Sequence, residues 1–98
     1  LVSGTTAMNG DRLIGGGDAA AQADFVLDKI EGALRSLGAT LEDVVRTRIY
    51  VTEQDDADAV ARVHGRRLAG IWPANTLVVT GLVGAGQLVE IEAEALVT

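Results

Sequence analysis

The chain has 98 residues, 48% of them apolar, so it fits a single folded domain spanning residues 1–98 and is too apolar for a disordered protein. Its formal net charge of −6 argues against a nucleic-acid groove, because binding phosphates needs clustered positive charge. The lack of cysteine excludes disulfides and thiolate sites, and a single histidine cannot form a multi-histidine metal site. Neither a signal peptide nor a run near the ~20 apolar residues of a spanning helix is recognisable, so we expect a cytoplasmic protein without a membrane partner.

The first part of the chain predicts a strand and then a long helix. Residues 1–7 (LVSGTTA) are a β-prone run ended by a turn at Asn9-Gly10, and residues 11–17 (DRLIGGG) form a second short extended piece. Asp18 is a suitable N-cap, and the helix that follows it stops at Gly38. The apolar stripe of this helix comprises Val26, Ile30, Ala33, Leu34 and Leu37.

The middle of the chain predicts a strand with one buried face and then a second helix. Residues 44–52 alternate in polarity after a capped turn at residues 40–43. The residues expected to face the core are Val45, Thr47, Ile49 and Val51, and those expected on the other face are Arg46, Arg48, Tyr50 and Thr52. The second helix is expected over residues 56–71, with His64 packed on its apolar side. Pro73 cannot continue this helix and favours an extended Trp72.

Two further strands are expected at residues 75–83 and 88–97. In the last strand, Val89, Ile91, Ala93 and Ala95 share one face, and Glu90, Glu92 and Glu94 share the other. Right-handed crossovers then place both helices on the same face of one sheet. The uncovered face carries charged side chains and a tyrosine, so we expect a closed oligomer to cover it.

The three glutamates of the last strand leave two interpretations open. Like charges at this spacing repel unless positive charge faces them, so in one interpretation they form a charge ladder with Arg46 and Arg48. In the other, one glutamate points into a pocket and acts as an acid or base or positions a water. Ser3 has no strand-to-helix elbow and no base, so we expect no nucleophile there, whereas Gly4 permits close approach of a ligand.

Four segments, taken in chain order, are LVSGTTA, GDAAAQADFVLDKIEGALRSLGATLEDVVRTRIYVTEQDDADAVARVHG, PANTLVV and LVEIEAEA. Together they resemble the reactive-intermediate deaminase family, also called the Rid or YjgF family and labelled endoribonuclease L-PSP. The resemblance implies a chorismate-mutase-like α/β (α+β) fold, with two helices on one face of each sheet and three copies forming a central barrel. It also implies ligand pockets between subunits. The hairpin with which family members usually begin has no counterpart in this sequence.

Active members of this family hydrolyse small enamine or imine acids, released by pyridoxal-phosphate enzymes, to keto acids and ammonia. They use no metal or cofactor, and the resemblance implies none here. It makes Glu90 the candidate catalytic residue, which would position the attacking water. The candidate substrate-binding residues are Ser3, Gly4, Arg48, Tyr50 and Asn75.

Asn75 departs from the family pattern. The family places an arginine after the Pro-Ala step, where its planar fork grips the substrate carboxylate, whereas the amide of Asn75 carries no charge. Ala61 likewise stands where the family has an asparagine. Losing a buried charged pair costs ~2–5 kcal/mol, so we expect weak deamination of carboxylate substrates unless Arg48 supplies the cation. Two functions therefore remain open, a deaminase-type hydrolase and a non-catalytic small-molecule binder or regulator, while the acidic charge disfavours a ribonuclease.

Overall fold

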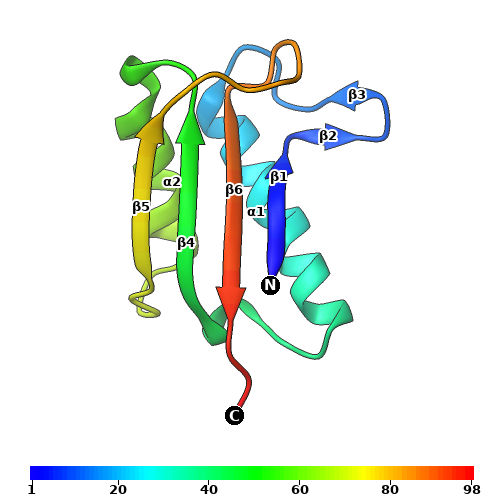
Figure 1. The fold of residues 1–98 in the computed structure, drawn as a ribbon, viewed down its shortest axis with the longest axis vertical. Helices are drawn as coiled ribbons and strands as arrows, with labels where there is room; N and C mark the ends of the chain where they lie inside the picture. Colours follow the sequence, from blue (N-terminus) through cyan, green and yellow to red (C-terminus); the bar gives the residue numbers. More distant parts are fainter.

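The computed structural model describes residues 1–98, whose main feature is a four-stranded mixed sheet (Figure 1). The strands, in their order across the sheet, are β1 (Val2–Thr6), β6 (Val89–Ala95), β4 (Val44–Val51) and β5 (Ala74–Val79). β4 and β5 run parallel, and the other two neighbouring pairs run antiparallel. A short hairpin of β2 (Met8–Asn9) and β3 (Arg12–Leu13) turns at Gly10, whose φ of 65° confirms the predicted turn.

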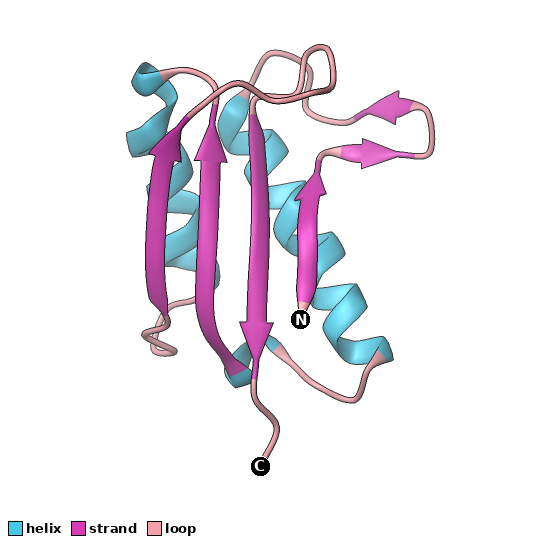
Figure 2. Cartoon of the chain, in the orientation of Figure 1, coloured by secondary structure: helices cyan, strands magenta, loops and turns pink.

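Two helices, α1 (Ala19–Ser36) and α2 (Ala57–Arg67), lie behind the sheet in Figure 2, which confirms the predicted two-layer arrangement. The Asp18 side chain accepts a hydrogen bond from the backbone of Ala21 at 3.1 Å and caps the start of α1. Gly38, with φ of 85°, reverses the chain after this helix, as predicted. The core between the layers is aliphatic and includes Val26, Leu27 and Ile30 of α1 and Ile49, Val51, Val89 and Ile91 of the sheet.

The second helix and the turn after it differ from the prediction. α2 ends at Arg67, short of the predicted Ile71, and Ile71 instead donates a backbone hydrogen bond to Leu68 at 3.1 Å in a tight turn. Trp72 is not extended: its φ is 58°, and its side chain is 89% exposed. The left-handed Trp72, together with Gly70 at φ 79°, turns the chain so that β5 can start beside β4 in parallel.

Two strand predictions also need correction. The register of β4 against β6 shifts between Val44 and Arg46, so Val44 lies in the core while Val45, predicted to face it, is 49% exposed. The predicted strand at residues 75–83 ends at Val79 because its partner β4 ends at Val51. The remaining core-facing positions of β4 and β6 are confirmed, with Ala95 partly buried against the core and the others buried, namely Thr47, Ile49, Val51, Val89, Ile91 and Ala93.

Candidate functional site

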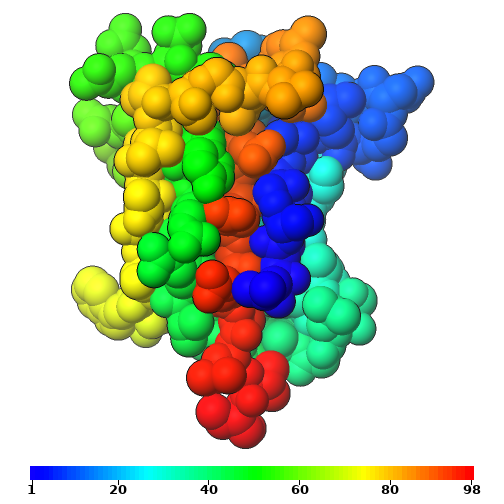
Figure 3. All heavy atoms as spheres, in the orientation of Figure 1, coloured from blue at the N-terminus to red at the C-terminus, as the bar shows by residue number.

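The face of the sheet away from the helices carries a ladder of charged residues from β4 and β6. Their register places Arg46 opposite Glu94, Arg48 opposite Glu92, and Tyr50 opposite Glu90. Successive residues of a strand point to opposite faces, so all six share this uncovered face. We call it the open face, and Figure 3 shows it with residues of β1, β6, β4 and β5 side by side.

Glu92 is the centre of this ladder. Its Oε1 accepts a hydrogen bond from the Tyr50 hydroxyl at 2.7 Å and lies 3.3 Å from Arg48 Nη1, which is also 3.9 Å from Glu94. The hydrogen bond from Tyr50, helped by Arg48, holds the pKa of Glu92 below its usual value. The same bond raises the pKa of Tyr50. The predicted ladder therefore holds for Glu92 and Glu94 with Arg48. Arg46 lies opposite Glu94 in the register but forms no ion pair, and its buried Nε has no hydrogen-bond partner.

Glu90 has a different environment at the edge where β1 meets β6. Val2 pairs with Ala93 and Thr5 with Ile91, so β1 holds one extra residue in a bulge at Ser3 and Gly4. A Cβ on Gly4 would lie 2.5 Å from Glu90 Oε2. The missing side chain of Gly4 thus provides the space that the Glu90 carboxylate occupies, and the structure brings these two candidate residues into contact.

A cavity of 380 Å³ opens on the same face beside this bulge. Its walls include Ser3, together with the charged side chains of Arg46, Arg48, Glu92 and Glu94. The Ser3 carbonyl accepts a hydrogen bond from the Thr5 hydroxyl at 2.9 Å. Four of the predicted site residues, Ser3, Gly4, Arg48 and Tyr50, therefore gather with Glu90 around β1, β6 and β4.

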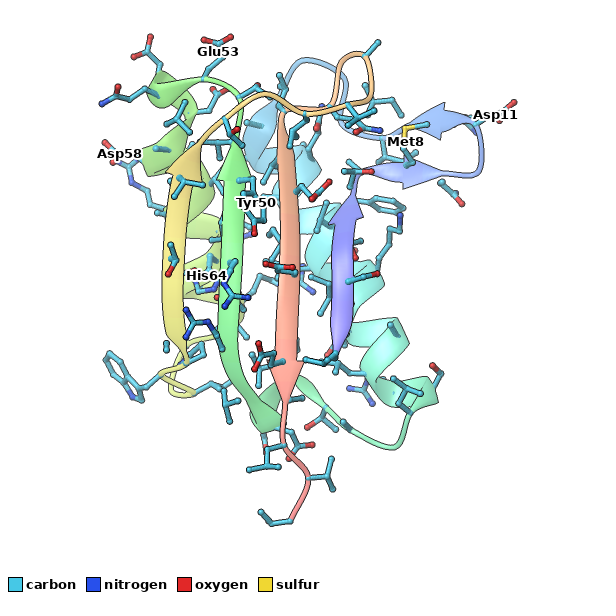
Figure 4. All side chains as sticks on the ribbon, in the orientation of Figure 1. Met8, Asp11, Tyr50, Glu53, Asp58 and His64 are labelled. Carbon is cyan, nitrogen blue, oxygen red and sulfur yellow. The ribbon has the colours of Figure 1, made fainter.

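Asn75 lies on the other side of the sheet. It pairs in register with Thr47, and the Thr47 hydroxyl donates a hydrogen bond to Asn75 Oδ1 at 2.9 Å. Thr47 Oγ1 also lies 2.7 Å from His64 Nε2 of α2. Thr47 and His64 are buried, whereas Asn75 is exposed at the β5 edge. Figure 4 labels Tyr50 of β4, which is on the open face, and His64 of α2, the helix on the other side of the sheet. Arg48 consequently does not reach Asn75 within one chain.

Burial lowers the pKa of His64, which keeps its ring neutral at pH 7. His64 is packed on the apolar side of its helix, as predicted, but its partner Thr47 was not identified as part of a polar site. The alternation of β4 placed Thr47 among the core-facing residues and gave no sign of its contacts. Those contacts depend on the parallel register with β5, which only the structure reveals.

No group of three or more histidine, cysteine, aspartate or glutamate side chains is placed to hold a metal ion. Neither α1 nor α2 is long and apolar enough to cross a bilayer.

Residues 1–97 match the family described as Endoribonuclease L-PSP. Over 96 residues the chain is 38% identical to an uncharacterized protein from Streptomyces coelicolor, a match covering 97% of this chain and 72% of that protein. Among solved structures, it is 47% identical to a YjgF/YER057c/UK114-family protein from Mycobacterium tuberculosis, covering 97% and 75% of the two chains with a TM-score of 0.82.

A Rid-family protein of unknown function from Yersinia pestis is 35% identical, with 98% and 76% of the two chains covered and a TM-score of 0.84. The family match spans nearly the whole chain, and both solved relatives reproduce the sheet with two helices on one face. The chain therefore belongs to the Endoribonuclease L-PSP family, as a protein of the YjgF/Rid type.

Proposed function

We propose that this protein is a homotrimeric hydrolase of small enamines or imines, with a pocket at each subunit interface where Glu90 positions the attacking water. The observation that carries the proposal is the Glu90 carboxylate lying against Gly4 on the open face. Unlike Glu92 and Glu94, it does not pair with Arg48. A carboxylate without a cation beside it is available to accept a proton from water.

The placement of Asn75 supports a pocket built from two copies. Asn75 and Glu90 lie on opposite faces of one sheet, so no small molecule can touch both within a single chain. A barrel of three sheets would cover the open face and bring the β5 edge of one copy near the β1 and β6 side of the next. Ser3, Gly4 and Glu90 of one copy and Asn75 of another would then line the same cleft.

The proposed reaction adds water across the carbon–nitrogen double bond. The Glu90 carboxylate accepts a proton as the water oxygen bonds to the imine carbon, and that proton is returned to nitrogen. The hydroxyl proton of the resulting carbinolamine then passes to nitrogen as the carbon–nitrogen bond breaks and the carbonyl forms, so imine and water become a carbonyl compound and ammonia. Gly4 has no side chain, which lets the Glu90 carboxylate lie against the β1 backbone, where it would hold the water.

A coupled assay tests this proposal by following freshly generated 2-aminoacrylate as it decays to pyruvate. We expect slow catalysis by the wild-type protein, because Asn75 offers no charge to the carboxylate. Asn75→Arg should raise the rate by at least about tenfold, a gain of ~1.4 kcal/mol. In that background, Glu90→Gln should return the rate to the uncatalysed one, and Gly4→Ala should lower it by displacing the carboxylate while leaving the fold intact. Full activity of the Glu90→Gln protein would contradict the proposal.

One observation favours the alternative, a non-catalytic small-molecule binder or regulator. Arg48, the candidate substitute for the family arginine, is engaged by Glu92 and Glu94 on the open face. If Asn75→Arg stays inactive while small molecules still bind at the interface, the binder is the better description. The family name also refers to ribonuclease activity, but the acidic ladder offers RNA phosphates no basic groove.

A further inference from the structure

The hydrogen bonds around Asn75 have a defined direction. A threonine hydroxyl has one proton, and that of Thr47 is donated to Asn75 Oδ1 at 2.9 Å. The 2.7 Å contact between Thr47 Oγ1 and His64 Nε2 must then be donated by the histidine. Because His64 is buried and neutral, its single ring proton lies on Nε2. The chain of donors thus runs from His64 through Thr47 to Asn75.

This direction decides which end of the Asn75 amide faces outward. Its oxygen is occupied by the Thr47 hydroxyl, which leaves the Nδ2 group and its protons for the exposed side of the β5 edge. An arginine at the same position would present several charged donors, whereas Asn75 presents a neutral one. Its partner in a ligand must therefore be a hydrogen-bond acceptor.

The surroundings favour an uncharged acceptor. A carboxylate moved from water into a closed interface pocket loses solvation and needs a cation to compensate. Arg46 and Arg48 lie on the opposite face of the same sheet, so within one chain neither supplies a cation to Asn75. In the cavity beside Ser3 that a neighbouring copy would contribute, these two arginines are balanced by Glu92 and Glu94, and Arg48 pairs with both carboxylates. A carbonyl oxygen loses far less solvation and recovers one hydrogen bond from the amide.

We propose that Thr47 and His64 are positioning residues that fix Asn75 as an outward donor, and that Asn75 binds an uncharged carbonyl oxygen of the ligand in place of a carboxylate. The inference rests on the interface pocket proposed above and names the class of molecule it takes. That class is a small neutral imine, enamine or carbonyl compound with an amide, ester or ketone oxygen as its anchor.

The experiment compares pyruvamide with pyruvate, two probes of nearly the same shape that differ in charge. Binding is followed by NMR titration of the 98-residue chain labelled with ¹⁵N, which reports the Asn75 side-chain amide and the His64 tautomer in the same sample. We expect pyruvamide to bind at least about tenfold more tightly than pyruvate, with the shift change centred on the Asn75 amide. The free protein should show His64 protonated on Nε2.

Variants separate positioning from simple stability. Thr47→Ser keeps the hydroxyl and should keep the preference for pyruvamide over pyruvate. Thr47→Val should reduce this preference to about twofold or less. Asn75→Arg should reverse the preference toward pyruvate. Because Thr47 is buried, Thr47→Val can fail to fold, so Asn75→Asp at the exposed position is the second variant. It keeps the acceptor for Thr47 but removes the outward donor, and should lose pyruvamide binding.

Three results would overturn the inference in distinguishable ways. Pyruvate binding at least as tightly as pyruvamide would refute the neutral ligand class and leave the hydrolase proposal intact. A His64 ring protonated on Nδ1 in the free protein would reverse the donor chain and refute the positioning role. If neither probe binds a protein shown to be trimeric, the interface pocket itself is refuted, and the inference falls with it.

Discussion

At the scale of single residues, His64 links the stability of this protein to pH. It is the only histidine, and its 8% exposure makes the charged ring costly in the folded state. Burial therefore lowers its pKa below the ordinary 6.5 of an unfolded chain. Protonation of His64 is thus linked to unfolding.

The sign of this linkage gives a pH prediction. Just below pH 6.5 the unfolded chain binds a proton at His64 that the folded chain does not, so the free energy of unfolding should fall as the pH is lowered. Urea unfolding between about pH 7.5 and pH 5 measures it. The pKa of Glu92 is also lowered, but its contribution to stability is lost only below the ordinary carboxyl pKa of 4.5, which lies outside this pH range.

His64→Gln is the matched control for this experiment. Glutamine retains a hydrogen-bond donor for Thr47 and does not titrate, so its stability should change much less over the same pH range. The prediction is contradicted if the free energy of unfolding of the wild-type protein varies with pH as little as that of His64→Gln between pH 7.5 and about pH 5. Charging the His64 ring would then cost nothing in the folded state.

At the scale of elements, the sequence patterns predicted both helices and the strands that carry the site. Alternation in residues 44–52 and 88–97 maps onto the two faces of a sheet, so the open face was correctly assembled from Arg48, Tyr50 and Glu90. The cap at Asp18 and the stop at Gly38 have local causes and were also recoverable. These features depend on neighbouring residues in the chain.

The features that the sequence patterns do not reveal depend on partners distant in the sequence. The bulges at Ser3–Gly4 and at Val45 are visible only in the pairing with β6, which no local pattern encodes. The opposite placement of Asn75 and Arg48 follows from the register of β5 against β4. Their separation explains why the residues alone could not decide whether Arg48 replaces the family arginine.

The contact between the two helices offers a test at this scale. The Arg67 side chain of α2 is 18% exposed and contacts Asp24 at 2.6 Å and Asp28 at 2.8 Å on α1. Arg67→Ala removes charged hydrogen bonds and packing at once, so it should lower the free energy of unfolding by about 1–3 kcal/mol. Urea denaturation of the two proteins gives the difference directly.

The adjacent Arg66 is the control for Arg67. Its side chain is 66% exposed, and its contact with Asp24 measures 3.4 Å. Exposed pairs of this kind contribute little, so Arg66→Ala should change the stability by no more than about 0.5 kcal/mol. Equal losses in the two variants would mean that charge balance, rather than the buried contact, holds the helices together.

At the scale of the whole molecule, one chain leaves half of its sheet surface uncovered. The open face carries the ladder of β4 and β6, and the edge strand β5 exposes Val78 and Val79 by 40% and 50%. Unpaired strand edges and exposed apolar side chains favour association, and a closed symmetric ring of subunits covers both the edges and the side chains. These features and the family membership support the proposed trimer.

The trimer has a direct test in light scattering coupled to size exclusion. We expect a particle of about 30 kDa, three times the 10.1 kDa chain. Val78 pairs with Tyr50 and shares the open face, so Val78→Glu would bury an unpaired carboxylate on association and should shift the mass toward one chain. Leu37→Glu, at a 70% exposed position beyond α1, should leave the mass unchanged. If the wild-type protein has the mass of one chain at micromolar concentration, the proposed pocket between copies is refuted. Asn75 and Glu90 could then not line the same site.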